Sequence, residues 1–507
     1  MSVARTWAVA LLGAEGECVE VEADLSKQTP EFRIIGLPDK ALGEAVQRVH
    51  NACANSGVPL PRRRLTVNLS PASLPKHGSG FDVAIAVASL ATESAMDAAS
   101  VASTVHIGEL GLDGRLRPVP GVLPAVVAAR RAGHRRVVVP HANGAEAALV
   151  DGVDVLAAVN LAQVLAWHGG DVEVADEEPV SLPDDEAVPE AALDLSEVIG
   201  QRDAVEALVV AAAGGHHLLM CGPPGAGKTM LARRLPGILP ELDDRAALAS
   251  ASIRSLAGSR VVEMSRTPPF EAPHHSASVA ALVGGGSRVV RPGAIARASE
   301  GVLFLDEAGE FTSSALDALR QPLESGSITI HRAGVQAQYP ARFQLVLATN
   351  PCPCGDYGIR GGTCTCPPAA IRRYLGRLSG PLLDRMDIEL TLTRVAVAQR
   401  DRGSGMSTAT ARQCVAEARA RAGHRLAGTP WKVNADVPGT WLREGPAAPS
   451  PVVRRPLDAA LHRGALTLRG YDRVLRVAWS LADIEGRGQL GAEHIGRALY
   501  LKKGIEL

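Results

Sequence analysis

The octapeptide GPPGAGKT, from Gly222 to Thr229, restricts most what this chain can fold into. It follows the apolar run from Leu218 to Cys221, and a helical pattern continues from Met230. This order predicts a strand, a tight loop and a helix. Glycines let backbone N–H groups face phosphate oxygens, and the helix N-terminus adds partial positive charge. The sequence therefore predicts a nucleoside-triphosphate site on a parallel α/β sheet.

Two residues of this loop carry side-chain roles. Lys228 is expected to reach the β- and γ-phosphates, and the hydroxyl of Thr229 is expected to bind Mg²⁺. The backbone of the whole loop is expected to surround the phosphates of ATP. Its members are Gly222, Pro223, Pro224, Gly225, Ala226, Gly227, Lys228 and Thr229.

Polar residues end two later apolar runs. Residues 302–305 lead into Asp306, suited to the magnesium shell, and Glu307, suited to orient and deprotonate the attacking water. Residues 345–348 lead to Asn350, whose amide could hold that water or sense the γ-phosphate. Alone, such residues are more often loop caps or turn formers. After a phosphate-binding loop, they predict a site of ATP hydrolysis.

Four of the eight cysteines lie within fifteen residues, in a C-x-C-x₉-C-x-C arrangement. Four thiolates on two turns could close a tetrahedral Zn²⁺ site, although each pair usually encloses at least two residues. Four reduced thiols in a loop are the alternative. This cysteine usage favours a reducing compartment, hence the cytoplasm. The cluster comprises Cys352, Cys354, Cys364 and Cys366.

Two histidine pairs, at 216–217 and 274–275, have no group of carboxylates or cysteines close by that would complete a ligand set. We therefore expect them to make packing or loop contacts rather than to bind a metal.

The length of 507 residues is too great for one core. Residues 1–170 alternate strand-like and helical runs, 171–192 form an acidic linker with nine acidic residues and three prolines, 193–395 carry the nucleotide site, and 396–507 are helical. The sequence contains no run of 18 apolar residues, so it predicts no membrane span. A net charge of −1 excludes a global basic field, so a nucleic-acid partner would need a local groove or a ring of loops.

The order of phosphate loop, acidic strand end and Asn-ended strand resembles the AAA+ superfamily. Longer phrases are similar to the YifB/ComM family of magnesium-chelatase-like AAA+ proteins across nearly the whole chain. They are residues 211–220 (AAAGGHHLLM), 272–276 (APHHS), 284–287 (GGGS), 350–355 (NPCPCG) and 380–385 (GPLLDR). The departures, PGA at 292–294 and AG at 308–309, touch no expected catalytic group.

The resemblance implies an α/β fold with three parts: an N-terminal Lon-protease-like domain, a central AAA+ core and a C-terminal helical lid. It sets Ile199 beside the adenine and makes Arg385 an arginine finger acting in trans, in a ring that is usually hexameric. The alternative for Arg385 is pairing with Asp384 or Asp387 at a helix end. Arg469 matches the lid arginine of the same branch, or is a solvated helix residue.

In the Lon register, the serine nucleophile falls at Gly80 and the catalytic lysine at Leu123. Neither residue can perform that chemistry, because a Ser–Lys dyad needs a hydroxyl and an amine. A shifted dyad of Ser79 and Lys76 is the alternative. We expect this domain to bind or position something instead.

Residues 327–337 predict a β-hairpin with a cationic tip, and in helicase relatives such a hairpin projects into the pore of the ring. Arg332 and His331 on the hairpin, with Arg288 and Arg291 on the preceding insert, could grip DNA phosphates. A solvated tip is the alternative.

The resemblance thus implies an ATP- and Mg²⁺-dependent motor for single-stranded or branched DNA, because ComM-like members are associated with branch migration in recombination and natural transformation. The alternatives are a protein-remodelling ATPase, a magnesium-chelatase-like ATPase without a DNA substrate, and a nucleotide-switched scaffold.

Overall fold

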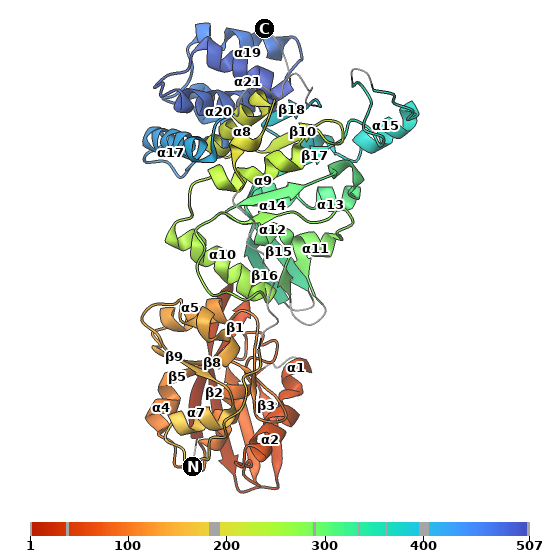
Figure 1. The fold of residues 1–507 in the computed structure, drawn as a ribbon. Coiled ribbons are helices and arrows are strands. Elements are labelled where there is room, and N and C mark those ends of the chain that lie inside the picture. The colour runs from red at the N-terminus through yellow and green to blue at the C-terminus, as the bar shows by residue number, and fades with distance from the viewer. Residues whose placement is uncertain are drawn as a thin grey trace.

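The computed structural model describes residues 3–36, 40–181, 193–286, 290–332, 335–359, 362–394 and 405–503. It shows three successive parts along one long axis, with the two termini at opposite ends (Figure 1). An N-terminal α/β unit is followed by a central α/β unit and then by a group of helices. The predicted α/β class and helical C-terminal region are confirmed; the likeness of the first unit to Lon stays a prediction.

The N-terminal unit contains a seven-stranded mixed sheet in the order β3-β4-β2-β1-β5-β8-β9. Side chains alternate along β1, so that Ala8 and Ala10 enter the core under α2 and α3, whereas Trp7, Val9 and Leu11 face the core under α5. Both faces of the sheet are therefore covered. The strands are β1 (Val3–Leu12), β2 (Glu15–Ser26), β3 (Glu31–Ile35), β4 (Arg64–Ser70), β5 (Thr104–His106), β8 (Arg136–Pro140) and β9 (Asp154–Ala158), beside the short pair β6 (Glu109–Leu110) and β7 (Leu116–Arg117). The helices are α1 (Lys40–Gly43), α2 (Ala45–Asn55), α3 (Asp82–Leu90), α4 (Ala98–Ser103), α5 (Val122–Arg131), α6 (Gly144–Ala147) and α7 (Leu161–Trp167).

The central unit contains a five-stranded sheet in the order β11-β14-β17-β10-β18, parallel throughout. Its strands are continuous apolar runs because both faces are buried: Met220 and Phe304 pack under α8 and α9, and Leu303 and Leu347 under α12 and α13. The strands are β11 (Phe270–Glu271), β14 (Val302–Leu305), β17 (Gln344–Thr349), β10 (Leu218–Cys221) and β18 (Ile388–Thr391). The helices are α8 (Arg202–Gly214), α9 (Lys228–Ile238), α10 (Asp244–Ala257), α11 (Val279–Val283), α12 (Ala294–Arg297), α13 (Ser313–Asp317), α14 (Arg320–Ser325), α15 (Pro368–Leu375) and α16 (Gly380–Leu383).

The predicted hairpin is present as β15 (Ser327–Arg332) and β16 (Val335–Pro340). A short ladder of β12 (Gly284–Gly285) and β13 (Arg291–Pro292) lies against it, because the Tyr339 hydroxyl donates to the Val290 carbonyl at 2.7 Å. The base of the hairpin also meets the N-terminal unit, where the Ala14 N–H donates to the Gln338 carbonyl at 3.2 Å. The hairpin is thus held between the insert and the first unit.

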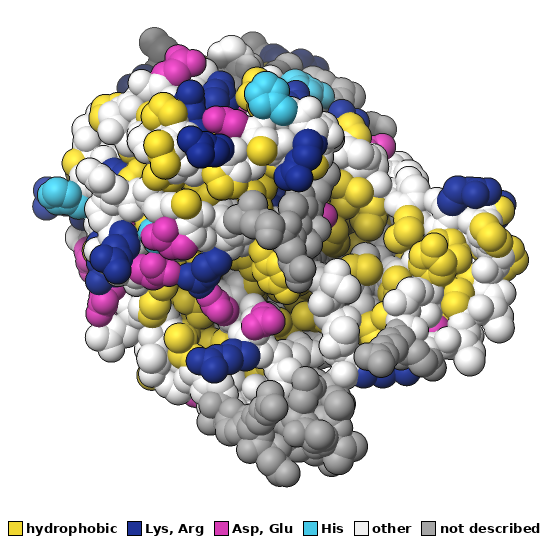
Figure 2. All heavy atoms as spheres, turned by 90° about the horizontal axis from the view of Figure 1, so that it is seen from above, with side chains coloured by type: hydrophobic (Ala, Val, Ile, Leu, Met, Phe, Trp, Pro, Cys, Tyr) yellow, Lys and Arg dark blue, Asp and Glu magenta, His cyan; other side chains and the backbone are white. Residues whose placement is uncertain are grey.

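The C-terminal helices cover one end of the central unit, and α20 is buried along most of its length against α8 and α17. Seen from this end, the segment carrying α15 projects from the body, with apolar and cationic side chains on its surface (Figure 2). No helix in the described ranges is both long and apolar enough for a membrane span. The helices are α17 (Thr408–Arg425), α18 (Gly439–Glu444), α19 (Pro451–His462), α20 (Leu468–Ile484) and α21 (Ala492–Lys503).

Candidate nucleotide-binding site

The phosphate-binding loop leaves the carboxyl end of β10 and enters α9 at Lys228. Gly225 and Gly227 have φ angles of +78° and +83°, which side chains with a Cβ rarely adopt. The loop therefore needs glycine at these positions to wrap around a phosphate. Because carboxyl ends of parallel strands share one edge, the ends of β14 and β17 lie beside it.

Lys228 is nearly buried inside the loop, where its Nζ donates to the carbonyls of Gly222 and Pro223 at 2.7 and 3.1 Å. It also donates to Asn350 Oδ1 at 2.9 Å. Burial lowers the pKa of Lys228, and the negative charge of Asp306 opposes that shift. The structure thus brings together a lysine and an asparagine that are 122 positions apart.

Thr229 and Asp306 meet as the sequence pattern predicts. The Thr229 hydroxyl donates to Asp306 Oδ2 at 2.6 Å, across the gap between α9 and the end of β14. A hydroxyl and a carboxylate this close are oxygen donors of the kind that Mg²⁺ prefers, so these residues fit the magnesium that accompanies a triphosphate. When bound, that ion would neutralise phosphate charge.

Glu307 has the left-handed backbone conformation φ 51°, ψ 43°, which is unfavourable for a residue with a side chain. The turn directs its half-exposed carboxylate away from the strand, and His275 Nδ1 lies 3.1 Å from Oε2. His275 was expected to make only packing or loop contacts, because no group of carboxylates or cysteines is near it in the sequence. Its partner comes instead from the end of a different strand.

Arg385 and Arg469 lie at the opposite edge of the sheet from the phosphate loop. In the parallel pairing of β10 with β18, Leu218 stands beside Ile388, so the residues just before Ile388 lie at the amino end of β10. The four residues of β10 separate these ends by about 13 Å. Neither arginine is therefore brought to the loop of its own chain.

The expected alternative for Arg385, a pair with Asp384 or Asp387, is not what the structure shows. Arg385 pairs with Glu324 of α14 and donates to the Pro381 carbonyl at 2.5 Å. Asp384 is 3.3 Å from Arg469 instead. Burial lowers the pKa of Arg385, and neighbouring arginines add to the shift.

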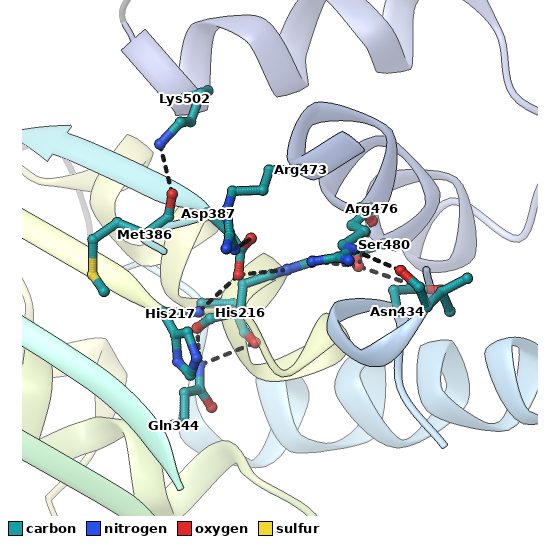
Figure 3. A network of polar contacts seen from close by, with 12 residues as sticks. His216, His217, Gln344, Met386, Asp387, Asn434, Arg473, Arg476, Ser480 and Lys502 are labelled. Atoms are coloured by element: carbon teal, nitrogen blue, oxygen red, sulfur yellow. Dashed lines mark hydrogen bonds and ion pairs between the residues drawn. The ribbon is translucent and has the colours of Figure 1, made fainter. Parts of the chain in front are cut away.

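Asp387 anchors this segment in a buried polar network that joins the central unit to α20 (Figure 3). Its carboxylate accepts from the His217 N–H at 3.1 Å and from Arg473 at 2.6 Å, and His216 Nδ1 lies 3.5 Å away. Burial alone would raise the pKa of Asp387, but contact with His216 and the charge of Arg473 outweigh it and hold that pKa well below its usual range. His216 also contacts Ser480 at 2.7 Å. The histidine pair at 216–217 thus has a carboxylate partner that sequence proximity did not reveal.

Ile199 is 44% exposed directly before α8, which leaves an apolar surface free beside the loop. Gln201, two residues later, donates from Nε2 to the Ala226 carbonyl at 2.5 Å. Sequence reasoning did not assign Gln201 a contact with the loop. Its position two residues after Ile199, which was expected beside the adenine, was the signal that could have indicated this contact.

The four clustered cysteines converge on one point. Their Sγ atoms all lie within 4.8 Å of one another, and Cys352 lies 3.3 Å from Cys354 and 3.7 Å from Cys364. Cys352 is buried, and the Tyr357 N–H donates to its sulfur at 3.4 Å. Four thiols with this spacing fit a tetrahedral metal ion.

The residues expected to contact DNA are partly described. His331 and Arg291 are exposed, on β15 and β13 respectively. Arg332 ends β15, and Arg288 lies outside the described residues. The Tyr339–Val290 contact joins the hairpin to the residue before β13, so His331 and Arg291 lie on elements that adjoin each other.

The Lon-like positions of the N-terminal unit hold no Ser–Lys pair. Ser79 donates to Glu109, whereas Lys76 Nζ donates to the carbonyls of Gly36 and Pro71. Leu123, at the register of the lysine, is fully buried where α5 packs on α10. The shifted dyad is therefore wrong for these two residues.

A phosphate loop, an acidic strand end and an asparagine gathered at one edge of a parallel sheet define the AAA+ class of nucleotide-binding proteins. The family description "Magnesium chelatase, subunit ChlI" matches residues 194–400, "Subunit ChlI of Mg-chelatase" matches 21–143, and "Magnesium chelatase, subunit ChlI C-terminal" matches 405–502. The chain belongs to the YifB/ComM family of magnesium-chelatase-like proteins.

Relatives match over almost the full length. A Mycobacterium tuberculosis protein is 48% identical over 505 residues, 99% of each chain. The competence protein ComM of Haemophilus influenzae is 41% identical over 517 residues, covering 100% of this chain and 99% of its own. YifB of Escherichia coli is 40% identical over 502 residues, covering 98% of this chain and 97% of its own.

Proposed function

We propose that this protein is a ring-forming ATPase that couples ATP hydrolysis to the remodelling of single-stranded or branched DNA. Its cofactors are ATP and Mg²⁺, with Zn²⁺ as a structural ion. The observation that carries the ATPase proposal is the meeting of Lys228 with Asn350 and of Thr229 with Asp306 at one edge of the sheet.

Each residue then has one task in hydrolysis. Lys228 binds the β- and γ-phosphates, Thr229 and Asp306 hold Mg²⁺, and Glu307 accepts a proton from the attacking water. Asn350, in contact with Lys228, orients that water or reports the γ-phosphate. Ile199 covers the adenine.

Arg385 and Arg469 act on the ATP of a neighbouring subunit. Support comes from the sheet, because both arginines lie at the edge away from their own phosphate loop. Arg385 must exchange Glu324 for a phosphate when a neighbour docks. A site shared in this way requires head-to-tail contacts between subunits, which we propose close into a ring of six.

The proposal of a DNA substrate rests on the hairpin and on the sequence similarity to ComM. Four side chains line the pore and bind DNA phosphates. They are Arg332 and His331 on the hairpin and Arg288 and Arg291 on the insert. ComM, 41% identical over the full chain, is a competence protein. Magnesium-chelatase-like remodelling of a protein, without DNA, is the second candidate, favoured by the family descriptions that cover all three parts.

DNA-stimulated ATPase activity on forked and four-way junction substrates separates the two candidates. DNA remodelling predicts faster ATP turnover with these substrates and ATP-dependent strand movement. The double variant Arg291→Ala/Arg332→Ala should lose the stimulation and keep basal turnover. Arg33→Ala, on the exposed edge strand β3, is the matched control and should keep both. Absence of stimulation and of strand movement in the unaltered protein would favour the protein-remodelling candidate.

A further inference from the structure

The cluster of Cys352, Cys354, Cys364 and Cys366 has no task in ATP hydrolysis. Within the described ranges it is the single group of His, Cys, Asp and Glu side chains whose ligand atoms converge closely enough to hold a metal ion. All four are free thiols. Tetrahedral zinc with Zn–S bonds of about 2.3 Å keeps its sulfurs about 3.8 Å apart. The sulfurs of Cys352, Cys354 and Cys364 are 3.3 to 3.7 Å apart, and all four lie within 4.8 Å of one another, which comes close to that geometry.

We propose that this cluster is a closed structural Zn²⁺ site that braces the phosphate-binding loop, so that zinc occupancy sets the affinity for nucleotide. The coupling to nucleotide rests on the proposed ATPase function; the metal site does not. Four thiolates leave no open coordination position, which is the property of a structural rather than a catalytic zinc.

The first cysteine pair is packed directly against the phosphate loop. Gly355 follows Cys354 with a φ of +86°, and its N–H donates to the Cys352 carbonyl at 3.0 Å. A Cβ at Gly355 would lie 2.4 Å from Cδ of Pro224. The turn that carries the two thiols thus packs directly against Pro224 of the phosphate loop.

The first pair is also tied to Asn350. The strand β17 ends at Thr349, whose carbonyl accepts from the Gly222 N–H at 3.1 Å, and Cys352 follows Asn350 by two residues. Any displacement of Cys352 therefore acts at once on Asn350 and on the start of the phosphate loop.

The second pair reaches the catalytic turn from the other side. Cys366 leads into α15, whose Tyr374 lies over Gly309: a Cβ there would be 2.4 Å from the Tyr374 ring. Gly309 is two residues beyond Glu307. A metal that joins the two pairs would fix the distance between the turn that packs against Pro224 and the turn that carries Glu307. Hydrogen bonds between the thiols would hold these two turns less firmly.

Metal content and nucleotide binding of the full-length protein test the proposal. Elemental analysis should find one zinc per chain, and Co²⁺ should replace it. Cys364→Ser should lose the metal and weaken binding of fluorescent ADP about tenfold, the usual scale for a lost supporting contact at a metal site. Cys414→Ser, a free thiol on α17, is the matched control and should change neither quantity.

The variant Gly355→Ala tests the contact with the phosphate loop independently of metal binding. It should keep one zinc per chain yet weaken ADP binding, because the new Cβ must displace Pro224. If Cys364→Ser fails to fold by circular dichroism, chelation of zinc from the unaltered protein provides the same comparison.

Zinc below about 0.1 per chain, or disulfides among the four cysteines, would overturn the metal site. Zinc-free protein that binds ADP as tightly as the loaded form would overturn the brace. Full zinc occupancy in a protein that never binds nucleotide would instead refute the proposed ATPase and leave the metal site standing.

Discussion

At the scale of single residues, Glu307 combines a strained backbone with a half-exposed carboxylate beside the magnesium-binding pair. Glu307→Gln keeps the shape of the side chain but cannot accept a proton. We expect ATP binding to persist while kcat falls at least about 100-fold, the scale of a lost general base. Steady-state turnover and ATP binding measure this, with Glu310→Gln, which contacts Arg377, as the neighbouring control. Turnover at the normal rate would mean that another residue activates the water.

His275 positions Glu307 rather than touching ATP. Its Nδ1 lies 3.1 Å from the Glu307 carboxylate, so His275→Ala frees that side chain to rotate. We expect kcat to fall about tenfold, equal to ~1.4 kcal/mol of transition-state stabilisation, with KM unchanged. His275→Asn should restore part of the rate.

His274 provides the matched control for that experiment. It stacks on His275 with ring centroids 4.0 Å apart and contacts Ser276 instead of a carboxylate. His274→Ala should change kcat much less. Equal losses in both variants would show that the loop as a whole matters, and not the contact with Glu307.

At the scale of elements, the predictable parts were those with a local signal. The strands β10, β14 and β17 are continuous apolar runs, and the β15–β16 hairpin alternates apolar with polar residues. The sequence pattern therefore predicts these strands. Lys228, Thr229, Asp306 and Asn350 were predictable because each sits where such a run ends. Their convergence then follows from the rule that parallel strands end at one edge.

The parts that could not be predicted depend on partners far apart in the chain. Asp387 meets His217 across 170 positions, and Glu307 meets His275 from a separate strand. Sequence proximity offered an adjacent aspartate as the alternative partner of Arg385, but helix α14 supplies Glu324 instead. Such pairs are set by packing of whole elements, which periodicity does not encode.

Asp387 links the segment before β18 to the residue before β10 and to helix α20. It is 1% exposed, so replacing it by Asn removes the counter-charge of Arg473, whose side chain is only 16% exposed. We expect Asp387→Asn to lower the free energy of unfolding by about 3–5 kcal/mol, as measured by denaturant titration. Asp384→Asn breaks only the exposed pair with Arg469 and should cost under about 1 kcal/mol. Equal costs would contradict the anchoring role.

A buried hydrogen-bonded chain across the N-terminal sheet makes stability depend on pH. His106 Nε2 and His168 Nε2 are 2.9 Å apart, and their other nitrogens contact Thr6 and Ser100 at 2.8 Å. One proton fits between the two facing nitrogens, and burial disfavours a charge on either ring. Burial, followed by the charge of Arg136, lowers the pKa of His168 to about 4, and burial lowers that of His106 as well.

Because unfolded histidine titrates near 6.5, the unfolded chain binds more protons between about pH 6.5 and 4. The contribution of His168 is therefore fully present above about pH 6.5 and is lost as the pH falls toward 4. Tm followed by near-ultraviolet circular dichroism should drop across this window, with Trp167, 5.0 Å from His168, as the reporter. His168→Gln should flatten the slope. An unchanged slope would exclude this histidine pair as its source.

At the scale of the whole molecule, the first unit contacts the central unit along β16 of the hairpin. Ala14 bonds to Gln338 of β16, and a Cβ at Gly13 would lie 2.2 Å from the Gln338 carbonyl. Ser255 of α10 contacts Gly121 and Leu123 in the same junction. Leu123, which the resemblance to Lon sets at the position of the lysine, is therefore part of the packing surface of this junction. These contacts hold the N-terminal unit against the hairpin.

The proposed inter-subunit site would be a property of the assembly, and mixing two inactive variants tests it. Lys228→Ala removes phosphate binding, and Arg385→Ala removes the finger, so each variant alone should lack turnover. In rings mixed in equal amounts, a subunit with intact Lys228 faces a neighbour with intact Arg385 at about one quarter of the interfaces of a head-to-tail ring. ATPase activity should therefore recover to roughly that fraction. If Arg385 served its own chain, every subunit would lack one essential group and the mixture would stay inactive.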